Sequence, residues 1–170
     1  MSLTIKKINQ LPAAEFIKLL GGIFEHSPWV AERAAHLRPF MKVSHLHHAM
    51  AQIVREASEG ERLMLIRAHP ELASKAAVRG ELTEASNKEQ SGAGLTQCSA
   101  EEFERMQALN AAYNKRFGFP FVIAVRGHDR ASILQHFAKR LEADKPTEMR
   151  ECIEQIIKIA QFRLQDLVSE

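Results

Sequence analysis

Apolar residues recur every three or four positions along almost the whole chain, which is the spacing of a buried helix face. The run after Pro12 keeps this spacing until Gly21 interrupts it, and Pro28 begins a second short helix. Ser44 and Ser99 precede longer apolar-periodic runs, as N-cap residues do. Further helices are expected over residues 60–68, 129–141 and 147–168. The pattern predicts an all-α protein of about seven or eight helices.

One stretch does not follow the helical spacing. Residues 119–125 read FPFVIAV, and Gly118 and Gly127 bound them. Such a β-branched and aromatic run is typical of a buried strand, but no second strand is expected to pair with it. We therefore expect an extended buried segment between helices. The 170 residues show no linker, repeat or charge block, so residues 1–170 are expected to form one compact domain.

Composition argues against several classes of protein. The chain has 23 basic and 21 acidic side chains and a net charge of +2, which gives little support to nucleic-acid binding. It has no apolar run of the length that spans a membrane, and its first residues lack the apolar core of a signal peptide. Two cysteines do not make a disulfide framework, so we expect a reduced, cytoplasmic protein.

His69 and Pro70 follow an apolar helical run and are the first candidates for chemistry. Proline fixes the backbone where the helix ends, and imidazole is the side chain whose ordinary pKa suits proton transfer near neutrality. The pair therefore indicates a general acid or base. A histidine that only completes a helix C-terminus gives the same pattern, because its charged form interacts favourably with the helix dipole.

Ser86, Glu89 and Gln90 are the second group of candidates, because residues three and four apart share one helix face. A hydroxyl, a carboxylate and a carboxamide on one face can bind a polar small molecule. Gly92 and Gly94 follow directly and would let the backbone approach a ligand. The alternative is structural, since Ser-x-x-Glu is also a capping box and glycines also end helices.

The extended segment offers backbone groups as a third candidate. The buried N–H and C=O groups of Phe121–Val125 need partners, which a planar heterocycle edged with amides would supply. Arg126 follows directly and either holds an anionic group bidentately or is a surface arginine. Arg163 lies on the apolar stripe of the last helix. A guanidinium there needs an anionic partner from the protein or from a ligand.

Two other classes of function stay open from the residues alone. His45 and His48 share a helix face, and together with His69 they would suit a metal-dependent hydrolase. No clear carboxylate companion accompanies them, so we expect no metal site. The other alternative is a helical interaction module without catalysis, which would expose a larger apolar groove.

Taken together, these segments resemble the 2-oxo-4-hydroxy-4-carboxy-5-ureidoimidazoline (OHCU) decarboxylase family over nearly the whole chain. Each motif alone is weak, but their order and combination are specific. The motifs that carry the resemblance are Gly22–Ala31, Ala68–Ala73, Leu82–Thr83 with Ser86, Glu89, Gln90 and Gly92–Leu95, Leu109–Tyr113, Phe117–Ile123 and Ile159–Leu164.

The resemblance implies an all-α enzyme that forms (S)-allantoin in the last step of urate conversion, with no cofactor and typically as a homodimer. It implies that His69 is the catalytic acid/base and that Glu89 acts with it. The backbone of the extended segment would bind the ring and ureido groups of the small-molecule substrate. The substrate-binding residues that it implies are Pro70, Ser86, Gln90, Phe121, Val122, Ile123, Ala124, Val125, Arg126 and Arg163.

Overall fold

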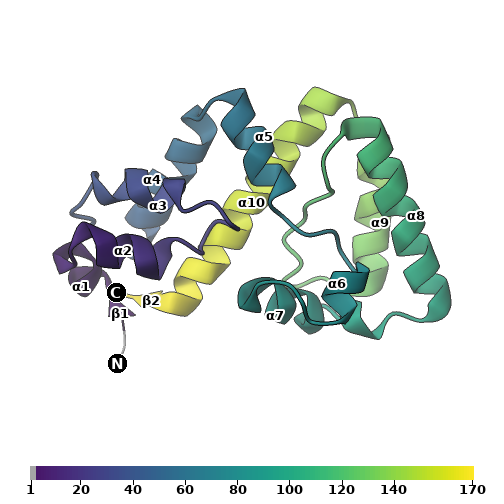
Figure 1. The fold of residues 1–170 in the computed structure, drawn as a ribbon, viewed down its shortest axis with the longest axis horizontal. Helices are drawn as coiled ribbons and strands as arrows, with labels where there is room; N and C mark the ends of the chain where they lie inside the picture. The colour runs from purple at the N-terminus through teal and green to yellow at the C-terminus, as the bar shows by residue number, and fades with distance from the viewer. Residues whose placement is uncertain (1–2) are drawn as a thin grey trace. The chain divides into compact units, whose positions relative to one another are not determined.

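The computed structural model describes residues 3–170, and helices dominate it (Figure 1). These residues contain ten α-helices, of which eight have seven or more residues, so the expected all-α class of about seven or eight helices is confirmed. The two short helices, which the sequence did not predict, are α1 (Ile5–Gln10) and α6 (Lys75–Val78). Contacts divide the chain into two compact units, Met1–Ala68 with Ile156–Glu170 and His69–Gln155.

Amphipathic helices build the first unit. Leu46, Met50 and Val54 are buried and recur every four residues along α4 (Val43–Glu56), so one face of this helix packs into the core. The unit also contains β1 (Leu3–Thr4), α1, α2 (Ala13–Leu20), α3 (Trp29–Ala35), α5 (Glu59–Arg67), the second part of α10 (Lys145–Leu167) and β2 (Val168–Ser169).

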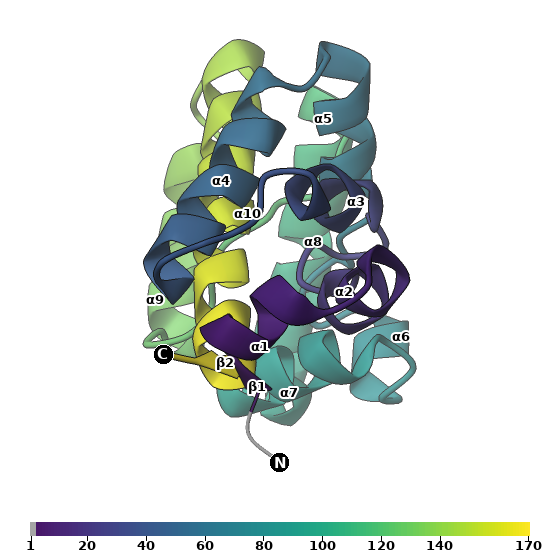
Figure 2. The same cartoon turned by 90° about the vertical axis from the view of Figure 1, so that its left-hand side faces the viewer.

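The two strands form a short parallel pair that the sequence did not predict. Leu3 pairs with Val168 and Thr4 with Ser169, and Figure 2 shows β1 beside β2. Two residues in each strand are too few to show the alternation of apolar and polar residues that predicts a strand.

Helix α4 begins earlier than its sequence suggests. Ser44 lies in the first turn, and the N-cap is Lys42, whose side chain makes no capping hydrogen bond. The Glu170 side chain supplies the missing acceptor, because its Oε1 accepts a hydrogen bond from the Val43 N–H at 3.0 Å. The expected cap was therefore wrong, since the true acceptor comes from a residue far along the chain.

An aromatic cluster lies in the core of the second unit. The ring of Tyr113 packs against those of Phe117, Phe119, Phe121 and Phe137 at centroid distances between 4.6 and 5.9 Å. These rings come from α8, α9 and the segment between them. The helices of this unit are α6, α7 (Glu84–Gly92), the 3₁₀ helix η1 (Leu95–Gln97), α8 (Ala100–Phe117), α9 (Arg130–Arg140) and the first part of α10.

Both ends of α8 follow the sequence prediction. Ser99 and Glu102 form the expected capping box, in which each side chain accepts a hydrogen bond from the other's backbone N–H. Gly118 ends the helix with a φ of 80°, a left-handed conformation that favours glycine. After it, residues 119–125 form no helix or strand and are all buried, which confirms the expected extended segment.

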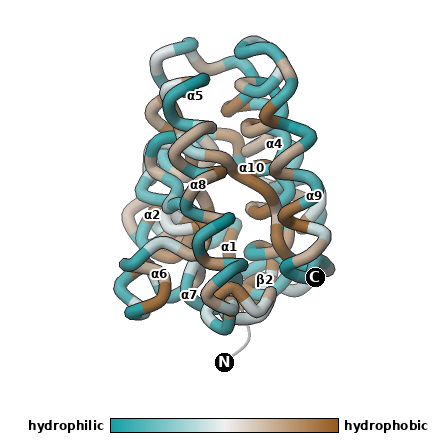
Figure 3. Tube along the Cα trace, turned by 90° about the vertical axis from the view of Figure 1, so that its right-hand side faces the viewer, coloured by the Kyte–Doolittle hydropathy of each residue, from teal (hydrophilic) through white to brown (hydrophobic). Residues whose placement is uncertain are grey.

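Polar residues interrupt the apolar ones along the helices of the second unit. Figure 3 shows hydrophilic and hydrophobic positions interspersed along α8 and α9. Within residues 3–170, no helix has both the length and the apolar composition needed to cross a membrane.

Candidate active site

The structure places His69 directly after helix α5. Ser58 and Glu61 form a capping box at the start of this helix, which ends at Arg67. Pro70 prevents the helix from continuing, because its ring removes an N–H and disfavours helical backbone in the preceding residue. His69 lies past the end of the helix, and only 7% of its surface is exposed. This position suits a proton-transfer group that is shielded from bulk water.

Gln90 joins helix α7 to the turn that follows His69. Its side-chain oxygen accepts a hydrogen bond from the Ala73 N–H at 3.0 Å, and its nitrogen donates to the Glu71 carbonyl at 3.3 Å. The side chain is buried. Both ends of the carboxamide therefore bind the backbone a few residues after the histidine and fix its position relative to α7.

Helix α8 supports the same turn. Asn110 donates to the Leu72 carbonyl at 2.9 Å, and Gln107 donates to the Ala73 carbonyl at 2.8 Å. Ala73 has a φ of 52°, a left-handed conformation that is unfavourable for a residue with a side chain. The side-chain hydrogen bonds therefore stabilise a turn that the local sequence disfavours.

Helix α7 buries two of its candidate side chains. Its N-cap is Thr83, whose hydroxyl accepts a hydrogen bond from the Ser86 N–H at 3.2 Å. Ser86 thus lies inside the first turn, so the alternative in which Ser86 itself caps the helix is wrong. Ser86 and Gln90 are each 4% exposed and share one face, whereas Glu89 is half-buried.

The glycines at the end of α7 and just after it shape the backbone. Gly92 is the last residue of the helix, and Gly94 has a φ of 79°, which favours glycine. Arg130 Nη1 donates to the Gly94 carbonyl at 3.0 Å and would lie 2.9 Å from a Cβ at this position. These contacts support the structural interpretation for Gly94, which turns the chain after the helix.

Side chains from α9 and α10 bind one set of backbone groups in the extended segment. Arg140 Nη1 donates to the Val122 carbonyl at 2.7 Å. Gln155 Oε1 accepts a hydrogen bond from the Ala124 N–H at 3.0 Å. The segment is therefore held at two alternate residues.

A second set of backbone groups in this segment is not used by these side chains. Among the hydrogen bonds found in residues 3–170, none involves the N–H of Ile123 or of Val125. Both residues are buried, and a buried N–H needs an acceptor. The two groups suit a ligand that carries carbonyl oxygens.

A buried ion pair adjoins the extended segment. Arg140 Nε donates to Glu148 Oε1 at 2.9 Å, and the two side chains are 12% and 2% exposed. The Tyr113 hydroxyl donates to the same oxygen at 2.6 Å. Burial raises the pKa of Tyr113, and contact with Cys152 and Glu148 raises it further. Burial also raises the pKa of the Cys152 thiol. Both groups therefore stay protonated near neutral pH, and Glu148 supplies the charge that neutralises Arg140.

Arg126 follows the extended segment at an exposed turn. Gly127 has a φ of 86°, and the His128 N–H donates to the Val125 carbonyl at 2.9 Å, which closes the turn. The arginine thus adjoins the buried backbone while its side chain is exposed. This placement is compatible with a surface arginine and with an arginine that receives an anionic group.

Arg163 belongs to the first unit, whereas the other candidate catalytic and substrate-binding residues belong to the second. Its Nη1 donates to the Gly22 and Ile23 carbonyls at 3.2 and 3.5 Å and lies 3.4 Å from Glu25 Oε1. Arg163 is 8% exposed and Glu25 is 2% exposed. A protein carboxylate therefore provides an anionic partner for this buried guanidinium, as the structural alternative requires.

The α4 histidines do not gather with other ligands. Within the part of the chain that the structure describes, no three His, Cys, Asp or Glu side chains are placed to hold a metal ion. His45 and His48 are exposed, and His47 Nε2 hydrogen-bonds with the Ile157 carbonyl at 2.9 Å. Among residues 3–170, the geometry therefore provides no set of ligands for the metal-dependent alternative.

Sequence reasoning missed the residues that support the candidate site. Gln107, Asn110 and Asn114 all donate to residues 71–73 from one side of α8. Their spacing of three and four is a polar stripe at helical period, and this signal was present in the sequence. Glu148 carries no comparable signal, because its contact with Tyr113 forms only in the folded chain.

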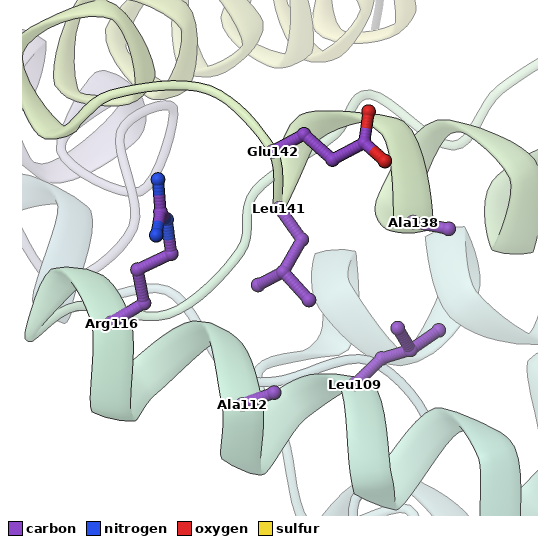
Figure 4. A pocket seen from close by; sticks show the side chains of 6 residues that line it. All are labelled: Leu109, Ala112, Arg116, Ala138, Leu141 and Glu142. Atoms are coloured by element: carbon purple, nitrogen blue, oxygen red, sulfur yellow. The ribbon is translucent and has the colours of Figure 1, made fainter.

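A shallow hollow elsewhere in the second unit is separate from these residues. Figure 4 shows α8 on one side of it and α9 with the residues that follow on the other. No candidate site residue lines it. Its lining residues are Leu109, Ala112, Arg116, Ala138, Leu141 and Glu142.

Comparisons with known proteins show relatives that are similar to almost the whole chain. Residues 9–165 match the model of a family described as OHCU decarboxylase. A 2-oxo-4-hydroxy-4-carboxy-5-ureidoimidazoline decarboxylase of Haloferax volcanii is 41% identical over 167 residues, which cover 98% of this chain and 97% of that protein. A uric acid degradation bifunctional protein of Bacillus sp. (strain TB-90) is 42% identical, over 98% of this chain but 32% of that protein. The chain thus spans about a third of the bifunctional protein.

A solved structure has the same fold. The crystal structure of (S)-allantoin synthase matches with a TM-score of 0.80 and 31% sequence identity. The match covers 98% of this chain and 54% of that one. The chain therefore spans about half the length of that protein.

Proposed function

Because the chain belongs to the OHCU decarboxylase family, we propose that it decarboxylates OHCU to (S)-allantoin, the final step of urate degradation to allantoin. One observation carries the proposal, namely the buried His69 turn that Gln90 joins to α7. Ser86 lies four residues before Gln90 on the same buried face of that helix, and Glu89 is its half-buried neighbour. The second unit thus contains an imidazole, a hydroxyl and a carboxylate on two elements that are fixed to each other.

The substrate supplies its own electron sink, which supports a mechanism without a cofactor. Its carboxylated ring carbon adjoins an imine carbon. When the bond to the carboxylate breaks, carbon dioxide leaves, and the electron pair forms a double bond between the two ring carbons. The imine electrons move onto nitrogen, which takes up a proton. The product of this step is an enol-like intermediate, and no external acceptor of the kind that cofactors provide is needed.

His69 and Glu89 take part in the remaining proton transfers of the proposed reaction. Glu89 orients His69 and the substrate hydroxyl. His69 delivers or relays a proton to one face of the ring carbon that carries the ureido group, and the hydroxyl loses its proton as a carbonyl forms. Spontaneous decay protonates both faces and gives racemic allantoin, so a closed pocket determines the handedness of the product.

The other candidate residues bind the substrate. Pro70 and Ser86 line the pocket. The backbone of Phe121–Val125 binds the ring and ureido groups, which is supported by the two buried N–H groups that the side chains of α9 and α10 do not use. An arginine holds the carboxylate before it leaves, and Arg126 and Arg163 are the two candidates.

The proposal extends to organisation and compartment. Residues 1–170 act as a single OHCU decarboxylase-like domain, which the family match over residues 9–165 supports. We propose a homodimer in the cytoplasm without nucleic-acid or membrane partners, and sedimentation of the purified protein tests the dimer. A net charge of +2 and two cysteines without a disulfide support this environment.

The test is circular dichroism of the reaction product. Urate is converted by urate oxidase and hydroxyisourate hydrolase, and this protein is then added in substoichiometric amount. Rapid growth of the (S)-allantoin signal is expected. A signal that does not exceed the slow racemic background, from folded protein, contradicts the proposal.

Two variants test the roles of the proton-transfer groups. His69→Asn and Glu89→Gln are each expected to lower kcat/KM by about 10²–10⁴-fold, the range for loss of general acid–base catalysis. His48→Asn is the matched control, because His48 is an exposed histidine on α4 and is not a site residue. Full rate and full product handedness in His69→Asn contradict the assignment. Stoichiometric zinc or iron in freshly purified protein, together with a loss of activity in His48→Asn, would favour the metal-dependent alternative.

A further inference from the structure

The extended segment has two backbone edges with different surroundings. In extended chain, successive residues direct their N–H and C=O groups to opposite sides. Val122 and Ala124 are bound by Arg140 and Gln155, so their groups point to α9 and α10. The residues between and after them direct their groups to the opposite edge, which includes the two N–H groups that no bond in residues 3–170 uses.

Arg140 makes three contacts at the first edge of the segment. Its Nη1 donates to the Val122 carbonyl at 2.7 Å while its Nε donates to Glu148 at 2.9 Å. The guanidinium also lies 4.4 Å from the centroid of the Phe121 ring. One planar group thus fixes a carbonyl, a carboxylate and an aromatic face in a single orientation.

Burying the ion pair of Arg140 and Glu148 costs desolvation free energy, which indicates a role beyond general packing. Glu148 is 2% exposed and Arg140 is 12% exposed at the side chain. Replacing a buried ion pair with well-packed apolar residues is often neutral or stabilising, so stability alone does not explain its presence. A role in fixing the orientation of the nearby backbone explains why the ion pair is present.

We propose that Arg140, held by Glu148, is a positioning residue for the reaction. It fixes the Val122 carbonyl and the Phe121 ring, so that the opposite edge of the segment presents the N–H groups of Ile123 and Val125 to carbonyl oxygens of the substrate. The inference rests on the proposed function, in which this backbone binds the ring and ureido groups.

The test separates positioning from stability through Arg140→Lys in the full chain. Lysine keeps the charge for Glu148 but is a point donor, so it cannot bind the carboxylate and the Val122 carbonyl in the fixed geometry of arginine. We expect KM for OHCU to rise about 10–100-fold and the (S) excess of the allantoin to fall, since small misplacements of binding groups have effects of this size.

Arg116→Lys is the matched control. Arg116 also donates to a backbone carbonyl, that of Ala143 at 2.8 Å, and its guanidinium lies 5.2 Å from the Phe117 ring. It is exposed, and its hydrogen bond goes to Ala143 rather than to residues 121–125. We expect its KM and product handedness to equal those of the wild type.

A second pair of variants keeps the inference testable if Arg140→Lys does not fold. Gln155 is half-buried, and its Oε1 accepts the hydrogen bond from Ala124. Gln155→Leu removes this acceptor, whereas Gln155→Glu retains one. The inference expects a higher KM and a lower (S) excess in Gln155→Leu and at least partial rescue of both in Gln155→Glu.

The outcomes distinguish this inference from the function on which it rests. If Arg140→Lys and Gln155→Leu lower the melting temperature but keep the KM and the (S) excess of the folded fraction, the residues are only structural and the inference is overturned. If the wild-type chain itself forms no (S)-allantoin above background, the proposed function fails, and the inference fails with it.

Discussion

The side-chain oxygen of Gln90 and the backbone N–H of Ala73 form a buried hydrogen bond of 3.0 Å. This bond crosses from helix α7 to the turn that follows His69. Because Ala73 has a φ of 52°, the turn depends on such bonds rather than on local preference. The position of His69 therefore depends on Gln90, which acts through its hydrogen bond to Ala73.

Gln90→Leu tests this dependence. Leucine has a similar size but no acceptor, so the buried Ala73 N–H loses its partner. We expect the free energy of unfolding to fall by about 1–3 kcal/mol, the cost of a buried polar group left unpaired. We also expect a lower kcat/KM. Urea denaturation and the allantoin assay measure the two effects. Gln52→Leu, at an exposed position on α4, is the control and should change neither.

Tyr113 provides a test by pH, because it is the only tyrosine in the sequence. Burial raises its pKa far above the ordinary value near 10. The folded protein should therefore show no tyrosinate absorbance at 295 nm at pH values where the unfolded protein shows it fully. A native tyrosinate signal near pH 10 would contradict the buried hydrogen bond to Glu148.

The same shift makes a prediction about stability. The folded state holds the phenolic proton of Tyr113 more tightly than the unfolded state does. The contribution of this group to the free energy of unfolding is therefore complete below about pH 10 and is lost as the pH rises further. Above that pH, the free energy of unfolding should fall with pH by about 1.4 kcal/mol per unit from this group. Tyr113→Phe should remove this part of the pH dependence, and denaturation at several alkaline pH values measures the difference.

The helices could be predicted from the sequence where their signals are local. The capping box at Ser99 and the αL glycine at Gly118 lie next to the helix that they bound, and both are found as expected. The start of α4 was wrong because its acceptor is Glu170, a residue distant in sequence. The strand pair was missed because two-residue strands have no periodicity to detect.

In the candidate site too, residues with a local sequence signal were predicted and residues defined by distant contacts were not. His69 and Ser86 stand out by local pattern, and the structure places both in the second unit at buried positions. Arg140 and Glu148 were not predicted because they belong to different helices, separated by a turn. The residues around each of them do not distinguish it from an ordinary surface charge. Such pairs require the folded geometry, since their partners are chosen by packing rather than by spacing.

The contact between Glu25 and Arg163 is expected to stabilise the first unit. Glu25→Gln removes a buried negative charge that faces a buried guanidinium. We expect a loss of about 2–3 kcal/mol in the free energy of unfolding, the cost of a lost charge-assisted hydrogen bond at a buried site. Glu32→Gln is the control, because Glu32 is exposed on α3. Equal stability of the two variants would contradict this role.

The two cysteines should differ in their reaction with a thiol reagent such as DTNB. The thiolate is the reactive form, and burial raises the pKa of both Cys98 and Cys152, with Glu102 adding to the rise at Cys98. Cys98 is half-buried, so it should react more slowly than a small thiol, whereas the fully buried Cys152 should react only when the protein unfolds. In Cys98→Ser, the reaction of the remaining thiol should follow the unfolding rate in denaturant, because access to Cys152 then requires opening of the core around Tyr113. Rapid labelling of this variant under native conditions would show instead that the core opens locally, and the ion pair of Arg140 and Glu148 would then lie in a mobile region unsuited to positioning the extended segment.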